Sequence, residues 1–412
     1  MKYISFLLSV LCFAATSAAQ LSPDVTSWII NSTGKTGYGG SVTNIQQVQY
    51  SDDYVYISAS CIPGYDIGPW PGNPNIPKNQ NFVYKITRHP QPNSGTAQAT
   101  QLGHIGVWTN GVSIFNAKDA MSYQNKGKWN QNAILVEGAS FDNCLGHPAP
   151  NGEYHHHLNP RCLYDDKDSL HHSPIIGFAF DGFPVYGAFG FPNLDGTGSP
   201  RRILSSYRKR SITDRSALPD GTVLVATEYG PAISTQYPLG YYIEDFEFIK
   251  SSGDLDEHNG RFCVTPEYPS GIYAYFVTLD EMGNAAYPYT LGLTYYGNVT
   301  LGNIGPGGGH NIISEPVKTY TSSGVSSDES QVEYSLFPNP ATNFVTIYIA
   351  PSSHNNLTMK LCDALGNELK RMKNVQPGVP YDLDLNFIPN GSYYLSLTDE
   401  QGSSVRKLII TK

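Results

Sequence analysis

The sequence predicts a mostly β protein: a β-rich domain with short helices and long loops, followed by a small C-terminal β-sandwich. Charged residues make up only 15% of the chain, whereas Gly, Pro and Tyr are abundant, with 40, 29 and 29 copies. No long run shows the 3.6-residue periodicity of an amphipathic helix, and short Val- and Tyr-rich segments alternate with turn residues instead. We therefore expect short strands joined by turns.

The first 19 residues are typical of a secretory signal peptide. Lys2 gives a positive start, residues 4–15 are mainly apolar, and Ser17-Ala-Ala19 is a small-residue cleavage site. The mature chain, from Gln20, is expected to leave the cytoplasm. No later run reaches the roughly 18 apolar residues of a membrane span, so no span is expected in the mature chain.

Residues 20–304 are expected to form the β-rich domain. Two Gly-containing segments, Asn110-Gly111 and Asp181-Gly182, are hairpin-turn signals between apolar runs. The strands that these and similar patterns predict lie at 48–50, 54–59, 105–108, 112–115, 175–180 and 183–187.

A flexible linker is predicted at 305–332, because a Gly-rich run leads there into a segment of Ser, Thr and acidic residues with little to bury. Residues 333–412 behind it have alternating apolar patterns separated by turn residues, which predict a small β-sandwich. Its expected strands lie at 344–349, 357–362, 381–385, 393–397 and 405–410.

The densest chemical signal is a group of histidines. Six of the eleven histidines in the chain fall between residues 142 and 172. Side chains alternate faces along a strand, so His155 and His157 are expected to share one face, with Tyr154 and His156 on the other. Two imidazoles on one face are expected to supply two ligands to one metal ion.

Two further histidines are expected to complete this site. His147 lies beyond a Pro-Ala-Pro-Asn-Gly turn that could fold it back, and His172 follows later in the chain. Three or four converging nitrogens are what a zinc or copper site requires, so a divalent transition metal, zinc or copper, is the predicted cofactor. The alternative is that the histidines are structural, either solvated or bonded to backbone carbonyls.

Two carboxylates are candidates for a supporting or catalytic role. Asp142 and Asp181 could each accept a proton from a ligand imidazole or act as a general base beside a metal. Asp181 also has a structural interpretation, because Asp-Gly is the preferred pair of a type I′ turn. Zinc would favour hydrolysis and copper would favour oxidation or sequestration, and the residues do not decide whether catalysis occurs.

Four cysteines of the body are expected to form disulfides in an oxidising compartment. The favoured pairing joins Cys144 to Cys162, because it closes a loop around the histidines and stabilises it by about 3 kcal/mol. Cys61 would then pair with Cys263. In the competing interpretation Cys144 and Cys162 are metal thiolates, which oxidation outside the cell disfavours.

The charge balance argues against nucleic acid as a partner, because the formal net charge is -9. A small-molecule or polysaccharide ligand is the candidate partner instead. One basic cluster is expected to be a solvated face and comprises Arg201, Arg202, Arg208, Lys209, Arg210 and Arg215.

The tail resembles the C-terminal sorting domain of type IX secretion. The features that carry this resemblance are Phe337-Pro-Asn-Pro340, Asp363-x-x-Gly366, Gly391-Ser-Tyr393-Tyr-Leu and Lys407-Leu-Ile-Ile-Thr-Lys412. They occur in order over residues 333–412. The resemblance implies export by the type IX machinery and a protein that is secreted or attached to the outer cell surface. The alternative is a β-sandwich module for carbohydrate binding or adhesion.

The body resembles the YHYH domain family over about residues 100–297. The resemblance is carried by Tyr154-His-His-His157, Asp142-x-Cys144-x-Gly-His147-Pro, His172-Ser-Pro, Asp181-Gly-Phe-Pro-Val-Tyr186-Gly, Gly253-Asp-Leu-Asp256 and Thr265-Pro-Glu-Tyr-Pro269. The second Tyr of the name motif is His156 in this chain. The family implies no particular reaction, so we expect a secreted or surface metal-binding protein, a candidate metal-dependent hydrolase or oxidase. The alternative is a non-catalytic surface module that binds polysaccharide or protein.

Overall fold

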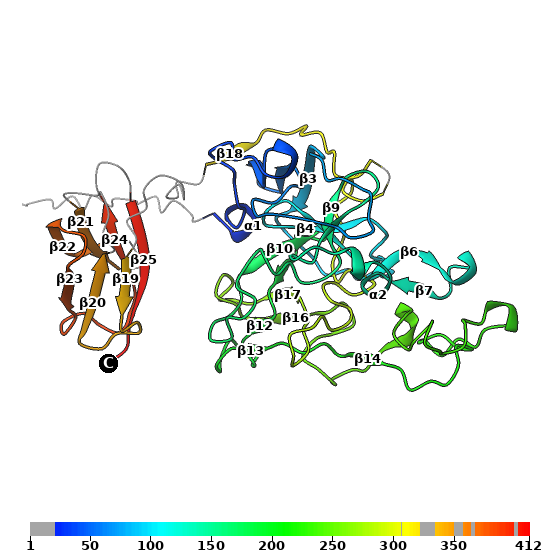
Figure 1. Ribbon diagram of the computed structural model, residues 1–412. Helices are drawn as coiled ribbons and strands as arrows, with labels where there is room; N and C mark the ends of the chain where they lie inside the picture. Colours follow the sequence, from blue (N-terminus) through cyan, green and yellow to red (C-terminus); the bar gives the residue numbers. More distant parts are fainter. Residues whose placement is uncertain (1–20, 306, 322–333, 350–356, 364–366, 399–402) are drawn as a thin grey trace, which may run out of the picture. The chain divides into compact units, whose positions relative to one another are not determined.

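A computed structural model describes residues 21–305, 307–321, 334–349, 357–363, 367–398 and 403–412. The chain divides into two compact units, Met1–Tyr320 and Thr321–Lys412, each with its own apolar core. Strands dominate both units and the helices of the described residues are short, which confirms the predicted mostly β class (Figure 1). The predicted signal peptide lies outside the described residues.

An eight-stranded mixed sheet forms the centre of the first unit, in the order β16-β17-β11-β10-β4-β5-β9-β8. Neighbouring strands run antiparallel, except that β17 is parallel to β11 and β9 is parallel to β5. Both faces of the middle strands are covered, so every residue of β4, β9 and β10 is buried. The strands are β4 (His104–Trp108), β5 (Ser113–Phe115), β8 (His147–Pro148), β9 (Tyr154–His156), β10 (Ile175–Ala179), β11 (Pro184–Tyr186), β16 (Gly260–Cys263) and β17 (Ile272–Phe276).

A second sheet has the order β18-β1-β2-β3. Its strands are β1 (Ile45–Tyr50), β2 (Tyr54–Ala59), β3 (Phe82–Thr87) and β18 (Lys318–Tyr320). The sequence alone assigns 305–332 to the linker, but the pairing of β18 with β1 places 318–320 in the first unit. An edge strand of Lys, Thr and Tyr carries too little apolar patterning to be recognised in a sequence.

The remaining elements of the first unit are short. Three two-stranded ribbons pair β6 (Lys118–Ser122) with β7 (Asn130–Asn132), β12 (Phe189–Gly190) with β13 (Arg201–Arg202), and β14 (Tyr207–Lys209) with β15 (Phe246–Phe248). The helical turns are α1 (Pro23–Thr26), α2 (Ala133–Glu137), η1 (Tyr38–Gly40), η2 (Tyr123–Asn125), η3 (Gly138–Ser140), η4 (Ala226–Glu228) and η5 (Ile243–Asp245).

The two predicted hairpin turns of the central sheet exist but are not of type I′. In each, only the glycine has a positive φ, 80° at Gly111 and 89° at Gly182. Gly111 N donates to Trp108 O, and Gly182 N donates to Ala179 O. This pattern is a three-residue loop with a glycine bulge, and it joins β4 to β5 and β10 to β11.

The structure contains the predicted Cys144–Cys162 disulfide, with a Cα–Cα distance of 5.2 Å. The predicted Cys61–Cys263 disulfide is wrong, because both residues are free and buried. The Cys61 thiol contacts Ser113 and Tyr154 O on β5 and β9, whereas Cys263 lies on β16. β16 and β5 are five strands apart in the sheet, a distance of roughly 20 Å or more, which no disulfide spans.

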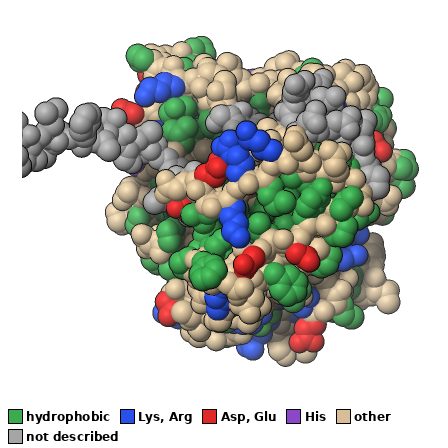
Figure 2. All heavy atoms as spheres, turned by 90° about the vertical axis from the view of Figure 1, so that its left-hand side faces the viewer, with side chains coloured by type: hydrophobic (Ala, Val, Ile, Leu, Met, Phe, Trp, Pro, Cys, Tyr) green, Lys and Arg blue, Asp and Glu red, His purple; other side chains and the backbone are tan. Residues whose placement is uncertain are grey.

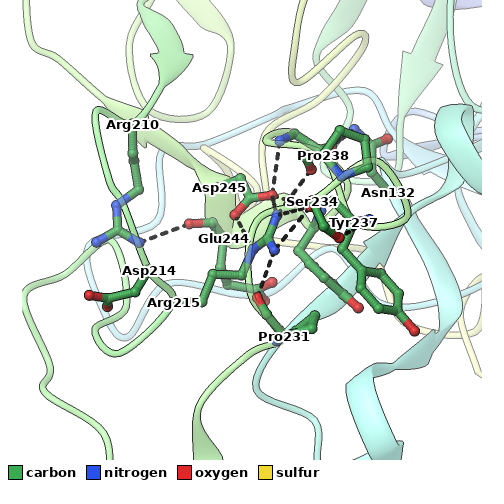
Figure 3. Close-up of polar contacts among 12 residues, drawn as sticks. Asn132, Arg210, Asp214, Arg215, Pro231, Ser234, Tyr237, Pro238, Glu244 and Asp245 are labelled. Atoms are coloured by element: carbon green, nitrogen blue, oxygen red, sulfur yellow. Dashed lines mark hydrogen bonds and ion pairs between the residues drawn. The ribbon is translucent and has the colours of Figure 1, made fainter.

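One member of the basic cluster is buried rather than solvated. Arg215 is only 1% exposed and forms two 2.8 Å hydrogen bonds with the buried carboxylate of Asp245. Its remaining N–H groups donate to the carbonyls of Pro231, Tyr237 and Pro238 (Figure 3). A planar guanidinium has enough donors to bind all these acceptors. The ion pair between Arg215 and Asp245 therefore stabilises the long segment between β14 and β15.

The C-terminal unit is formed by two antiparallel sheets, β19-β20-β23 and β22-β21-β24-β25. All five predicted strands exist, and β19 and β22 are additional. Residues 364–366 of the predicted turn lie outside the described residues. The strands are β19 (Tyr334–Phe337), β20 (Phe344–Ile349), β21 (Leu357–Cys362), β22 (Glu368–Val375), β23 (Pro380–Asp384), β24 (Gly391–Thr398) and β25 (Ser403–Ile410).

The surface of the molecule mixes side-chain types. Figure 2 shows one face on which scattered Lys and Arg side chains lie among acidic and apolar ones, without a broad basic stripe. Within the described residues, no helix has the length and apolar character needed to cross a membrane.

Candidate metal centre

The site is organised by β9 and the residue that follows it. His155 pairs with Ser113 of β5 on one side and with His147 of β8 on the other. Its Nε2 atom lies 3.2 Å from Nε2 of His157, so these two side chains share a face of the strand, as the sequence predicts. The backbone pairing therefore brings three histidines from two adjacent strands to one place.

Four donor atoms converge there. Nε2 of His155 is 3.0 Å from Nε2 of His147 and 3.2 Å from Nε2 of His157. Oε2 of Glu137 is 3.1 Å from Nε2 of both His147 and His157. All four atoms lie within 4.8 Å of one another. Neighbouring ligands of one transition-metal ion, at bond lengths of about 2.0–2.2 Å, are separated by about 3 Å, so these residues fit a single ion.

The other ring nitrogens fix the tautomers of two of these histidines. Nδ1 of His155 lies 3.1 Å from the carbonyl oxygen of Glu153, and Nδ1 of His157 lies 2.6 Å from that of Asn116. A carbonyl oxygen only accepts hydrogen bonds, so each Nδ1 carries the proton in the neutral ring. Each Nε2 is then left with a free lone pair directed into the cluster.

The same tautomer follows for His147 from its serine neighbour. Ser140 Oγ donates its single proton to Glu137 O at 2.8 Å. It lies 2.8 Å from Nδ1 of His147, closer than the amide nitrogen of Asn73 at 3.5 Å, and because its own proton goes to Glu137 it accepts a hydrogen bond from that Nδ1. Nε2 of His147 thus also presents a lone pair, and three lone pairs meet without a proton between them.

Glu137 completes the set with an anionic oxygen. Its Oε2 atom is buried and takes part in no hydrogen bond, although two imidazole nitrogens lie 3.1 Å away. Burial and the adjacent imidazoles lower the pKa of His155 well below its usual value, so that ring is neutral. A cation is the group that would satisfy all four donors.

The donor atoms of Glu137 and His155 are farther apart than those of the four pairs that lie 3.0–3.2 Å from each other. No ion-pair contact within 4.0 Å joins Glu137 to His155, both of them described residues, although their donor atoms lie within 4.8 Å. If an ion lay about 2.1 Å from both atoms, the angle between its bonds to them would be at least about 140°, compared with about 109° in a tetrahedron. The arrangement therefore resembles part of a five- or six-coordinate sphere more than a closed tetrahedral site.

Sequence reasoning missed Glu137. It is the last residue of the short helix α2. The side chain of Asn132, the N-cap residue, caps this helix by accepting a hydrogen bond from Ile134 N. A carboxylate on a five-residue helix has no spacing pattern that links it to His147, ten residues later. Only the packing of α2 beside the β6–β7 ribbon brings the two together (Figure 1).

The four donors line a cleft of about 620 Å³, so the site is open on one side. Asp119 of β6 also lines it, and burial, followed by the hydrogen bond and charge of Glu137, raises the pKa of Asp119 to about 6. Phe115 packs its ring on that of His155, with centroids 3.8 Å apart. The walls further include Asn73, Asn75, Leu102, Lys118 and Val136.

Asp142 lies on the opposite face of β9 and is not placed to act as a base at the cluster. Its Oδ2 atom accepts hydrogen bonds from Tyr154 OH at 2.9 Å, Gly68 N at 2.8 Å and Trp70 Nε1 at 3.1 Å. Its Oδ1 atom accepts from Cys144 N at 2.9 Å. A carboxylate with these donors is a structural anchor for the chain around β9.

The other two predicted site residues also lie elsewhere. Asp181 is buried in the β10–β11 turn and accepts hydrogen bonds from Tyr275 OH at 2.6 Å and Gly297 N at 2.9 Å. Burial raises the pKa of Asp181 to about 6. His172 packs against Tyr186 of β11, four strands from β9, and does not belong to the four-residue cluster. The sequence thus identifies three of the four converging side chains.

The two units match two different protein families. The model of the YHYH protein family matches residues 83–287, which contain all four converging residues. The chain belongs to the YHYH protein family. The family model of the Secretion system C-terminal sorting domain matches residues 335–411 of this YHYH protein. No curated protein matches the chain.

The sorting domain implies type IX secretion and a location at the outer surface for this YHYH protein. Its name motif, Tyr154 to His157, divides between the two faces of β9: two histidines enter the cluster, and Tyr154 holds Asp142. His156 is fully buried, and neither of its ring nitrogens has a hydrogen-bond partner. Burial lowers the pKa of His156 to about 3, so it remains neutral.

Proposed function

We propose that this secreted YHYH protein binds one divalent transition-metal ion through His147, His155, His157 and Glu137 and presents it to a small ligand in the cleft. The observation that carries the proposal is the set of three Nε2 lone pairs and one carboxylate oxygen, all facing one point with no proton to share. Histidines with a merely structural role would be expected to pair a donor with an acceptor.

The geometry favours an ion with more than four ligands. The wide separation of Glu137 from His155 supports an approximately opposite pair, which suits tetragonal copper or another five- or six-coordinate ion better than a closed zinc site. The remaining positions would face the cleft, because all four donors line it.

The ligand of such an ion would enter from the cleft. A bound ion supplies Lewis acidity or, if it is redox-active, electron exchange. Asp119 is the carboxyl group that lines the same cleft next to Glu137, so it replaces Asp142 and Asp181 as the residue placed to exchange a proton with a bound ligand. Phe115 and Leu102 give the cleft apolar wall area for an organic ligand.

The test is metal content of the mature chain purified without a His tag. We expect about one equivalent of a transition metal by elemental analysis, and Glu137→Gln should weaken the affinity for added Cu²⁺ or Co²⁺ by at least about tenfold. Asp142→Asn is the matched control, since it removes a buried carboxylate on the other face of β9 and should leave the affinity unchanged. Absence of metal, together with no uptake of Cu²⁺, Co²⁺ or Zn²⁺ at micromolar concentration, would refute the proposal.

The spectrum of the Co²⁺-loaded protein tests the coordination number. Five- and six-coordinate Co²⁺ absorbs visible light much more weakly than tetrahedral Co²⁺, and we expect the weak spectrum. Addition of azide, a small anionic ligand, should change it, because the cleft leaves a position open. An intense tetrahedral spectrum that azide does not alter would indicate a closed structural site.

A further inference from the structure

We infer that His104 and Glu153, a buried ion pair at the start of β9, act as a positioning pair that holds His155 in its metal-binding tautomer. The inference rests on the proposed function and extends it to residues outside the cluster. Neither side chain faces the cleft, so neither is a candidate ligand.

Both residues of the pair are buried and hydrogen-bonded. His104 is 9% and Glu153 is 4% exposed. Nδ1 of His104 donates to Glu153 Oε1 at 2.9 Å, and its Nε2 donates to Asn303 O at 2.5 Å. Both ring nitrogens of His104 therefore face hydrogen-bond acceptors. Ser113 Oγ donates to the same carboxylate oxygen at 2.5 Å.

The link to the cluster is the backbone of Glu153. Its carbonyl oxygen accepts the Nδ1–H of His155 at 3.1 Å, the bond that leaves Nε2 free for an ion. The same carbonyl accepts from Ala149 N at 2.9 Å and so closes the hairpin between β8 and β9. Anchoring the Glu153 side chain therefore also fixes the direction of this carbonyl.

The surroundings keep the pair rigid. Ser113 lies on β5 directly opposite His155 in the parallel pairing of β5 with β9. The same residue donates a hydrogen bond to the carboxylate of Glu153, so it links that carboxylate to the register of β9. The ring of His104 is enclosed by Phe82, Tyr84 and Phe180, with centroids 5.3 to 5.8 Å away. A buried charge pair contributes little to stability compared with apolar residues, and a role in fixing a local geometry is consistent with its presence here.

The experiment replaces the pair by apolar residues of similar size in the mature full-length chain, as His104→Phe/Glu153→Met. This change leaves no unpaired buried charge, so the fold should persist. Long-range ¹H–¹⁵N spectra of the metal-free protein report the tautomer of His155 directly. We expect a pure Nδ1–H form in the wild type, a tautomer mixture in the variant, and an affinity for Co²⁺ at least about tenfold weaker.

The matched control is a second buried ion pair, Arg215 with Asp245 (Figure 3). Arg215→Met/Asp245→Leu should leave the His155 tautomer unchanged, because the hydrogen bonds of that pair lie within the segment between β14 and β15. If the first variant does not fold, His104→Gln is judged by the same two measurements. A folded variant with wild-type tautomer and affinity would overturn the inference. A wild-type chain that has the Nδ1–H tautomer but binds no Co²⁺ would refute the proposed function instead.

Discussion

At the scale of single residues, the two faces of β9 have different roles, and this can be measured. His155 and His157 converge on the cluster, whereas His156 is buried on the other face without a polar partner. We predict that His155→Ala and His157→Ala each weaken binding of Co²⁺ by at least about a hundredfold. His156→Ala should instead lower the free energy of unfolding by about 2–4 kcal/mol through the cavity it leaves, with little change in affinity. Equal losses of affinity in all three variants would contradict the assignment of faces.

The sequence predicts the residues of the cluster only where a local rule connects them. Strand alternation pairs His155 with His157, and the short turn before them returns His147 to the same place. Glu137 and His172 depend on long-range packing instead. Glu137 comes from α2, which is positioned by the β6–β7 ribbon, and the position of His172 is set by its aromatic contacts near β11. No pattern in the chain encodes either placement.

At the scale of elements, the disulfide joins the ends of the segment that carries three of the four converging side chains. Cys144 and Cys162 are 18 residues apart and enclose β8 and β9. We predict that Cys144→Ser/Cys162→Ser lowers the free energy of unfolding by about 3 kcal/mol and also weakens Co²⁺ binding, because the open loop costs more entropy to order. Urea unfolding and metal titration measure the two effects. Cys263→Ser, which alters a thiol that forms no disulfide, is the control and should leave the affinity unchanged.

The β6–β7 ribbon is tied to η5 by a partly buried carboxylate. Glu244 accepts hydrogen bonds from Asn130 N at 2.7 Å and Asn130 Nδ2 at 2.6 Å. Burial nevertheless raises the pKa of Glu244 from 4.5 to about 7. Between these values the folded protein keeps a proton that the unfolded chain has released, so stability falls as the pH rises through this window.

This difference predicts the pH dependence of the ribbon. As the pH rises from 4.5 to 7, release of the Glu244 proton should lower the free energy of unfolding by up to about 3 kcal/mol. In Glu244→Gln this part of the pH-dependent decrease should be absent. Urea unfolding of both proteins at several pH values measures it. Parallel pH profiles for wild type and variant would show that Glu244 titrates normally.

The elements that the sequence predicts correctly are those with a buried face. All five predicted strands of the tail and the apolar strands of the central sheet exist, because alternation or continuous apolar runs mark them. β22, with the sequence Glu-Leu-Lys-Arg-Met-Lys-Asn-Val, is an edge strand whose residues are mostly exposed, and it escaped prediction. β18 escaped for the same reason. Edge strands gain their stability from backbone pairing, which leaves little trace in side-chain pattern.

At the scale of the whole molecule, the two units have separate cores that share no residue. The Glu137–His147–His155–His157 cluster lies entirely in the first unit, and the sorting domain lies in the second. A unit with its own core is expected to fold without the other. The sorting function and the metal-binding function should therefore separate on truncation.

We predict that a chain ending at residue 321 keeps β18 and binds Co²⁺ with the affinity of the full chain, whereas it is not delivered to the outer surface. The matched control is a chain ending at residue 304, which lacks β18 and the bridge between His310 and Val83 and should unfold at a lower temperature. Thermal unfolding, metal titration and fractionation of the producing cells give the three measurements. Surface delivery of the shorter chains, or loss of metal binding on removal of residues 322–412, would show that the units depend on each other. The comparison of the two end points also locates the boundary of the first unit, which composition alone places too early because the polar strand β18 resembles linker.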